Sequence, residues 1–188
     1  MSTTTQNRLE SRLGGVTIEG EPHSLSAWFV VGLRVMMGWV FLTAGLGKFA
    51  FVSGESFNAA GYLANVDPAS PVAGTYAAMA AMPELMAIVN VTVPVTQVLI
   101  GIALIAGAFV RLAALGGAMQ MAMFYLGGYE GGGMLAAIDS NFVYMMLFLA
   151  IGAFAAGRIL GLDRYIENVR VGGERLIERY PKARYLLG

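Results

Sequence analysis

Long uncharged stretches dominate the pattern of hydrophobic and polar positions along this chain. Residues 85–110, 112–129 and 140–157 contain no charged side chain, and residues 28–51 contain only two, Arg34 and Lys48. A helix needs roughly 17–25 predominantly apolar residues to cross the hydrocarbon core of a bilayer. The pattern therefore predicts a multi-pass protein with four membrane-spanning helices. Their expected ranges are 26–52, 84–109, 111–126 and 140–159.

The segments between and beyond these helices complete the predicted organisation. A polar N-terminal tail over 1–25, which lacks the pattern of a cleavable signal peptide, precedes a transmembrane domain over 26–160. A tail over 161–188 mixes basic, acidic and apolar residues, and Gly172 and Gly173 are expected to divide it. The expected fold class is all-α, an integral membrane four-helix bundle.

The two predicted outer loops differ in composition. Residues 53–83 are too rich in alanine and methionine for a solvated loop, so one or two short helices are expected there, on the membrane surface or capping the bundle. The glycine-rich sequence at 127–133 is expected to form a hairpin.

Charge is distributed unevenly between the two predicted sides of the membrane. The outer loops, 52–83 and 128–139, contain no lysine or arginine, whereas the segment from Arg158 to Arg184 contains seven basic residues. Loops rich in lysine and arginine remain on the cytoplasmic side of a membrane. Both termini are therefore expected in the cytoplasm, with the C-terminal tail at the membrane interface and its arginines directed towards anionic head groups.

Composition restricts the available chemistry. The chain has no cysteine, which excludes thiolate nucleophiles and iron–sulfur clusters, and its single histidine, His23, precedes the first predicted helix. A bis-histidine haem inside the bundle is thereby excluded, and no phosphate-binding loop of Walker or Rossmann spacing is present. We expect no metal site, no covalently bound cofactor and no nucleic-acid partner.

Polar and small residues recur together on one face of each predicted helix. At helical spacing, Arg34 and Lys48 share a face with Gly38 and Gly45, and they lie about 21 Å apart along the axis. Such faces are expected to turn inward, because small residues allow close helix packing and amides bond between helices. The corresponding faces of the next three helices are Asn90, Pro94, Gln97 and Gly101; Ala113, Gly116, Gln120 and Phe124; and Asn141, Met145, Phe148 and Gly152.

Depth sorts these polar residues into layers. Arg34 belongs to the inner third of the membrane, and Gln97 and Gln120 lie near the midplane. These three are the candidate quinone- or substrate-binding residues. An outer polar cluster comprises Lys48, Glu84, Asn90, Asp139 and Asn141.

Each of these residues has a structural interpretation as well. Buried Gln and Asn can serve only as interhelical contacts, and Arg34 is close enough to the inner head groups to reach them by snorkelling. Lys48 with Glu84 or Asp139 would form an interfacial ion pair. An intramembrane arginine without an acidic partner at its own depth is costly, however, and is a functional candidate by default.

Two sequence motifs resemble the DoxX/DoxD family. The run RVMMGWVFLTAGLGKF (34–49) is similar to its first-helix signature, and PVTQVLIGIALIAGAFVRLAAL (94–115) is similar to its second helix and the following turn. The resemblance implies a small four-helix membrane protein of a prokaryotic plasma membrane. It places Arg34, Lys48 and Arg111 on family motif positions. Gln97 stands where many members carry a glutamate, so it cannot transfer a proton as a carboxylate would.

The resemblance implies a membrane subunit of a quinone-linked oxidoreductase of the thiosulfate:quinone type. A quinone is then the expected ligand, and membrane lipids, further copies of the chain or subunits of a redox complex are the expected partners. The alternative is a non-catalytic scaffold or accessory subunit that docks a partner through exposed outer residues such as Tyr62 and Tyr76. A small-solute transporter is less favoured, because no pair of interrupted helices in matching positions is evident.

Overall fold

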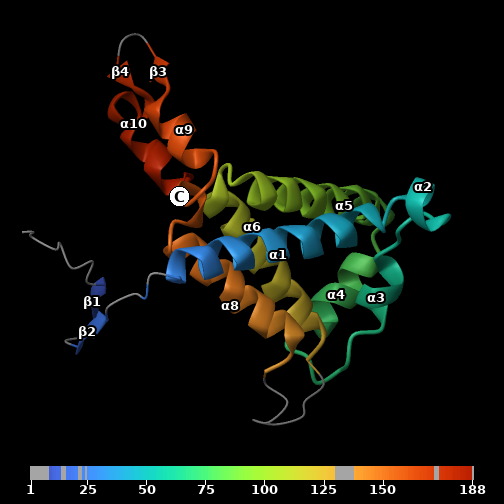
Figure 1. Cartoon of the computed structure of the whole chain (residues 1–188). Helices are drawn as coiled ribbons and strands as arrows, with labels where there is room; N and C mark the ends of the chain where they lie inside the picture. The colour runs from blue at the N-terminus through green and yellow to red at the C-terminus, as the bar shows by residue number, and fades with distance from the viewer. Residues whose placement is uncertain are drawn as a thin grey trace, which may run out of the picture.

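The structure, a computed structural model, describes residues 9–13, 16–20, 23, 25–129, 138–171 and 174–187 (Figure 1). Helices dominate it, and the four longest lie together as its body. The helices are α1 (Ser26–Leu46), α2 (Ala50–Ser53), α3 (Ala60–Ala64), α4 (Ala73–Ala80), α5 (Pro83–Ala106), α6 (Val110–Gly127), α8 (Ser140–Ala153), η1 (Ala156–Arg158), α9 (Asp163–Asn168), α10 (Leu176–Arg179) and η2 (Pro181–Tyr185).

The described parts of the two tails also contain short antiparallel hairpins. In the N-terminal tail β1 (Leu9–Leu13) pairs with β2 (Val16–Gly20), and in the C-terminal tail β3 (Arg170–Val171) pairs with β4 (Glu174–Arg175). Both hairpins lie outside the helical body (Figure 1). The predicted break at Gly172 and Gly173, and residues 130–133 of the predicted outer hairpin, lie outside the described residues.

One apolar core joins the long helices. Met37 and Phe41 of α1, Leu104 of α5, and Phe148 and Ile151 of α8 are at most 2% exposed and belong to one cluster. Phe41 meets Phe148 edge to face with ring centroids 4.6 Å apart. The helix faces that the sequence predicted to turn inward therefore do so in α1, where Arg34, Gly38, Phe41 and Gly45 are buried.

The outer surface of this body is apolar. Among the helices in the described residues, α1 and α5 are long and apolar enough to cross a membrane, and α8 is a shorter apolar helix. Large apolar side chains that point away from the core are well exposed, among them Trp28 at 65%, Trp39 at 62% and Ile88 at 62%. A contiguous apolar exterior of this kind indicates contact with lipid or another protein.

Glycines let α1 and α5 approach until their backbones touch. A Cβ built on Gly101 would lie 2.5 Å from the backbone nitrogen of Leu42, and one on Gly38 would lie 3.0 Å from the carbonyl oxygen of Gly101. Gly117 of α6 plays the same role against α8, because a Cβ there would lie 2.5 Å from the Phe148 ring. Small residues therefore set the distances between these helices.

Two predicted helices end earlier than expected. The first, predicted over 26–52, ends at Leu46, because Gly47 follows and Phe49 adopts an extended conformation before α2 begins. The fourth, predicted over 140–159, ends at Ala153, because Ala155 has a positive φ of 50° that is incompatible with an α-helix. Hydropathy continues through both breaks, so the apolar pattern could not locate them.

Candidate functional site

A large apolar cavity lies between α5 and α6, beneath α3 and α4. It is open along one side, where its lining residues Ile88, Leu99 and Met119 are 60–62% exposed. Its volume is about 970 Å³. The face of α6 that sequence periodicity singled out lines it, because Ala113, Gly116, Gln120 and Phe124 all contribute to its wall. The opposite wall comes from α5. Its residues lie one or two positions away from the face formed by Asn90, Pro94, Gln97 and Gly101. They are Ile88, Val89, Thr92, Val93, Thr96, Leu99, Ile100 and Ala103.

The cavity has a polar end and an apolar end. Lys48, Tyr62, Tyr76 and Asn141 line it near the α3–α4 cap, whereas Leu99, Ala103, Phe109 and Leu112 line the end near the α5–α6 turn. Along α5 the wall extends from Ile88 to Ala103, about 22 Å at 1.5 Å per residue. This gradient suits an elongated amphiphile with its head at the capped end and its tail along α5 and α6.

Gln120 and Thr96 provide a polar pair in the middle of the wall. The Gln120 amide nitrogen donates to the Thr96 hydroxyl oxygen at 3.4 Å, and that hydroxyl donates to the Thr92 carbonyl at 2.7 Å. The Gln120 amide oxygen is buried and has no hydrogen-bond partner among the described residues. An unsatisfied buried acceptor is rare in native proteins, so this oxygen marks Gln120 as the polar side chain of the wall whose hydrogen bonding is incomplete.

Lys48 brings a positive charge to the capped end. Its ammonium donates to the Ala44 carbonyl at 3.0 Å and lies 5.6 Å from the centroid of the Phe57 ring. Within the described part of the chain it forms no ion pair with Glu84 or Asp139. The ion pair considered from the sequence is therefore not formed.

The α3–α4 cap is fastened to α6 by three hydroxyl groups. Tyr76 donates to the Met123 carbonyl at 3.0 Å, Ser70 to the Leu126 carbonyl at 2.6 Å, and Tyr62 to the Phe124 carbonyl at 3.3 Å. These bonds reach the C-terminal end of α6, where the last carbonyls of a helix lack intrahelical partners. The Phe124 carbonyl also accepts from the Gly128 backbone nitrogen at 2.8 Å. Burial raises the pKa of both tyrosines, with Tyr76 and Asp139 adding to the effect at Tyr62, so both phenols remain donors at neutral pH.

The scaffold interpretation had predicted Tyr62 and Tyr76 to be exposed. Tyr62 is 46% exposed, but Tyr76 is only 6% exposed because its ring fills the space between the cap and α6. Sequence could not separate the two, since both occur in the same alanine-rich segment.

Replacing Tyr76 with Phe is expected to lower the free energy of unfolding by about 1 kcal/mol, because the Met123 carbonyl loses its donor. Thermal unfolding in detergent measures this loss, with Tyr165→Phe as control because Tyr165 is 72% exposed. The contribution should weaken above pH 10, where tyrosine of the unfolded chain ionises before buried Tyr76 does. Equal losses in the two variants would contradict this role.

The other members of the predicted outer cluster have local structural partners. The Asn90 side-chain oxygen accepts from the Ala59 backbone at 2.8 Å and so ties α5 to the cap. Asp139 caps α8 by accepting from the Phe142 backbone at 2.8 Å, and it also accepts from the Asn141 amide at 2.8 Å. Glu84 is exposed in the first turn of α5. Only Lys48 and Asn141 of this cluster line the cavity.

Arg34 holds the chain that follows α8. Its guanidinium donates to the carbonyls of Ala156 at 2.5 Å, Ile159 at 3.0 Å and Leu160 at 3.1 Å, and the side chain is 2% exposed. It packs against the glycines of two turns, since a Cβ on Gly107 or Gly161 would come within 2.9 Å of its nitrogen. Arg34 is thus directed into the protein rather than towards head groups, and it does not line the cavity.

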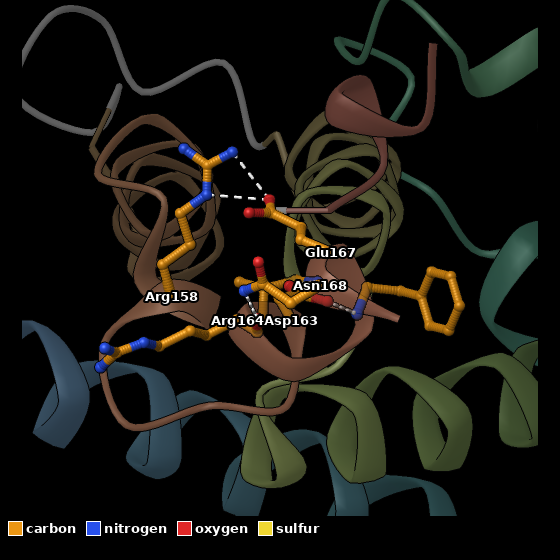
Figure 2. Close-up of polar contacts among 7 residues, drawn as sticks. Arg158, Asp163, Arg164, Glu167 and Asn168 are labelled. Atoms are coloured by element: carbon orange, nitrogen blue, oxygen red, sulfur yellow. Dashed lines mark hydrogen bonds and ion pairs between the residues drawn. The ribbon is translucent and has the colours of Figure 1, made fainter. Parts of the chain in front are cut away.

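Asp163 is the acidic residue near Arg34 that the sequence did not reveal. It is fully buried, and its carboxylate accepts from the backbone nitrogens of Phe109 at 2.6 Å and Val110 at 3.0 Å, at the start of α6 (Figure 2). It also attracts the Arg34 guanidinium electrostatically. Sequence placed Asp163 in a solvated tail, and no periodic signal connects it to residues more than 50 positions away.

Gln97 lies apart from both Arg34 and Gln120. It is 2% exposed in the α1–α5 interface, where a Cβ on Gly45 would lie 2.9 Å from its own Cβ, and its amide oxygen has no described partner. Of the three residues predicted to surround a ligand head group, only Gln120 lines the cavity.

A model of the DoxX family matches residues 29–128. The matched region begins in α1 and ends just after α6, so it contains both long walls of the cavity and its cap. No curated protein and no solved structure matches the chain.

Proposed function

Because the chain belongs to the DoxX family and is therefore a membrane protein, we propose that α1, α5, α6 and α8 all cross the membrane as a four-helix bundle. The proposed location is the plasma membrane of a prokaryote, with both termini in the cytoplasm. Charge supports this orientation, since the C-terminal segment is rich in arginine while the described outer cap, 53–83, has none.

We propose that the α5–α6 cavity binds a quinone and that the protein is the quinone-binding membrane subunit of an oxidoreductase. The observation that carries this proposal is an apolar cavity of about 970 Å³ with one buried, unpartnered amide oxygen in its wall. Ligand sites are typically apolar cavities of 300–1,000 Å³ in which a few polar groups fix orientation. The isoprenoid tail would lie along the apolar end of the cavity.

The Gln120 side chain fits the head group of a quinone in either redox state. Its amide nitrogen can donate to a quinone carbonyl, and its amide oxygen can accept from a hydroquinone hydroxyl. Thr96 orients the amide through the bond at 3.4 Å. A neutral aliphatic chain alone would leave the amide oxygen unsatisfied.

We propose that electrons reach such a quinone from a second protein. The chain has no cysteine, and among the described residues no group of three or more His, Cys, Asp or Glu side chains is placed to hold a metal. The proposed partner therefore carries the redox centre and the site for the oxidisable substrate.

Gln120→Leu is expected to reduce quinone binding by roughly three- to tenfold, because the head group loses a hydrogen-bonding partner. The matched control is Gln97→Leu, since Gln97 is also a buried glutamine with an unpartnered oxygen but does not line the cavity. Quinone extracted from protein purified in mild detergent, and cross-linking by a photoreactive quinone, give the measurement. Equal binding by both variants and the parent would overturn the assignment.

The outer cap gives the accessory-subunit alternative a specific observation. In α2, Phe51 is 80% exposed and Val52 is 55% exposed, so an apolar surface lies beside the cap. The same purification distinguishes the two functions. A scaffold would be favoured if the purified protein contained a stoichiometric protein partner and no bound quinone, and if the Phe51→Ser variant lost that partner.

A further inference from the structure

The C-terminal unit, residues 158–187, is firmly attached to the body. Backbone bonds join Leu162 to the Ala106 carbonyl at 3.2 Å and Asp163 to the Gly107 carbonyl at 2.9 Å. At the other end of the unit, the Leu186 carbonyl accepts from the Leu112 backbone at 3.3 Å, and Leu187 is 1% exposed. The unit therefore has a fixed place beside the α5–α6 turn.

Internal pairing leaves the unit with a basic surface. It contains seven basic and four acidic residues. Asp163 is buried in the cap of α6, and Glu167 is 8% exposed and bonded to Arg158 at 2.7 and 2.9 Å (Figure 2). Five basic side chains remain exposed across the rest of the unit: Arg164, Arg170, Arg175, Arg179 and Lys182. Of these, Arg175 lies 3.9 Å from Glu178, which is exposed as well.

Apolar and aromatic side chains are exposed among these basic residues. Leu160 is 69% exposed, Tyr165 72% and Tyr185 79%. A surface that met only water would not gain from so many exposed apolar groups. Tyrosines beside arginines are typical of the boundary between head groups and acyl chains.

The position of the unit agrees with a place on the membrane surface. In Figure 1, α9, α10 and the β3–β4 hairpin extend from the end of the body in a direction that crosses the long helices. If those helices run along the membrane normal, the unit extends along the surface. Leu160 and Leu162 then lie where the chain leaves the apolar exterior.

We propose that the C-terminal unit binds the head groups of anionic phospholipids, with its arginines at the phosphates and its exposed leucines and tyrosines in the interface. Each arginine near an anionic surface contributes roughly a fivefold preference for the bound state. The proposal does not depend on quinone binding, because no residue of the unit lines the cavity.

Hydrogen exchange of the full-length protein in lipid nanodiscs tests the proposal. Amides of residues 160–187 are expected to exchange at least tenfold more slowly in discs containing 30% phosphatidylglycerol than in discs of pure phosphatidylcholine. The difference should shrink in 0.5 M salt, because exposed charges are then screened.

Matched variants separate this surface from general attraction to the membrane. Arg164→Gln with Arg170→Gln is expected to abolish most of the difference, since both side chains are exposed. Arg8→Gln with Arg12→Gln, which removes the same charge from the N-terminal tail, should leave it intact. Exchange within α5 and α6 reports whether each variant is folded.

Equal exchange in the two kinds of disc would overturn the proposal. So would protection that appears only when a soluble partner protein is added, or a loss of protection that is the same in both double variants.

Discussion

An Arg34→Leu variant is expected to lose about 3–5 kcal/mol of unfolding free energy, the usual cost of removing one partner from a buried charged contact. Three carbonyls, those of Ala156, Ile159 and Leu160, lose their donor together, and buried Asp163 loses the cation that attracts it. Thermal unfolding in detergent measures the loss of stability, and hydrogen exchange should locate it in residues 156–163.

Arg34→Lys provides the control for charge. An ammonium keeps the attraction to Asp163 but cannot reach three separate carbonyls as a planar guanidinium does, so about half of the loss should remain. Quinone binding by the folded fraction of either variant should match the parent, because Arg34 does not line the cavity. Full stability combined with lost quinone would instead assign Arg34 to the ligand, as the sequence suggested.

Gly101→Ala is expected to lower the unfolding free energy by about 1–3 kcal/mol, towards the upper end of the range for overpacking. The added methyl would lie 2.5 Å from the Leu42 backbone nitrogen and 2.8 Å from the Gly38 carbonyl oxygen, and a backbone cannot rotate away as a side chain can. The α1–α5 contact would have to open. Thermal unfolding and cross-linking between the two helices measure this change.

Gly32→Ala is the matched control for that substitution. Gly32 lies in α1, and a Cβ built there meets nothing within 4 Å. Because alanine favours helices more than glycine does, this variant should be as stable as the parent or slightly more so. If Gly101→Ala behaved in the same way, the close α1–α5 contact would be wrong.

Inward-facing positions of the helices followed from the sequence, because helical periodicity is a local property. Arg34, Gly38, Phe41 and Gly45 in α1, and Pro94, Gln97 and Gly101 in α5, are buried as the periodicity indicated. The sequence also identified the face of α6 that carries Gly116 and Gln120, but it did not indicate what that face contacts. It lines a cavity, while the neighbouring face, with Gly117, packs on α8.

The partners of the polar residues could not be predicted in this way. Gln97 and Gln120 were assigned to one layer by depth, yet one lies in the α1–α5 contact and the other in the cavity wall. Depth along a helix axis gives height only, and rotation about the axis decides which neighbour a side chain meets.

The local pattern of the sequence by itself determined that this is an apolar, helical membrane protein. It also determined where the main helices lie and which of their faces turn inward, because hydropathy and residue spacing are properties of a few helical turns. Only the tertiary structure decided that Arg34 binds the carbonyls after α8, that Asp163 caps α6, and that α5 and α6 line an open cavity. The contacts of Arg34 and Asp163 join residues 50 to more than 120 positions apart, and their energies depend on which backbone groups remain unpaired when the helices pack. The cavity joins two consecutive helices, but its position depends on how each is rotated about its axis.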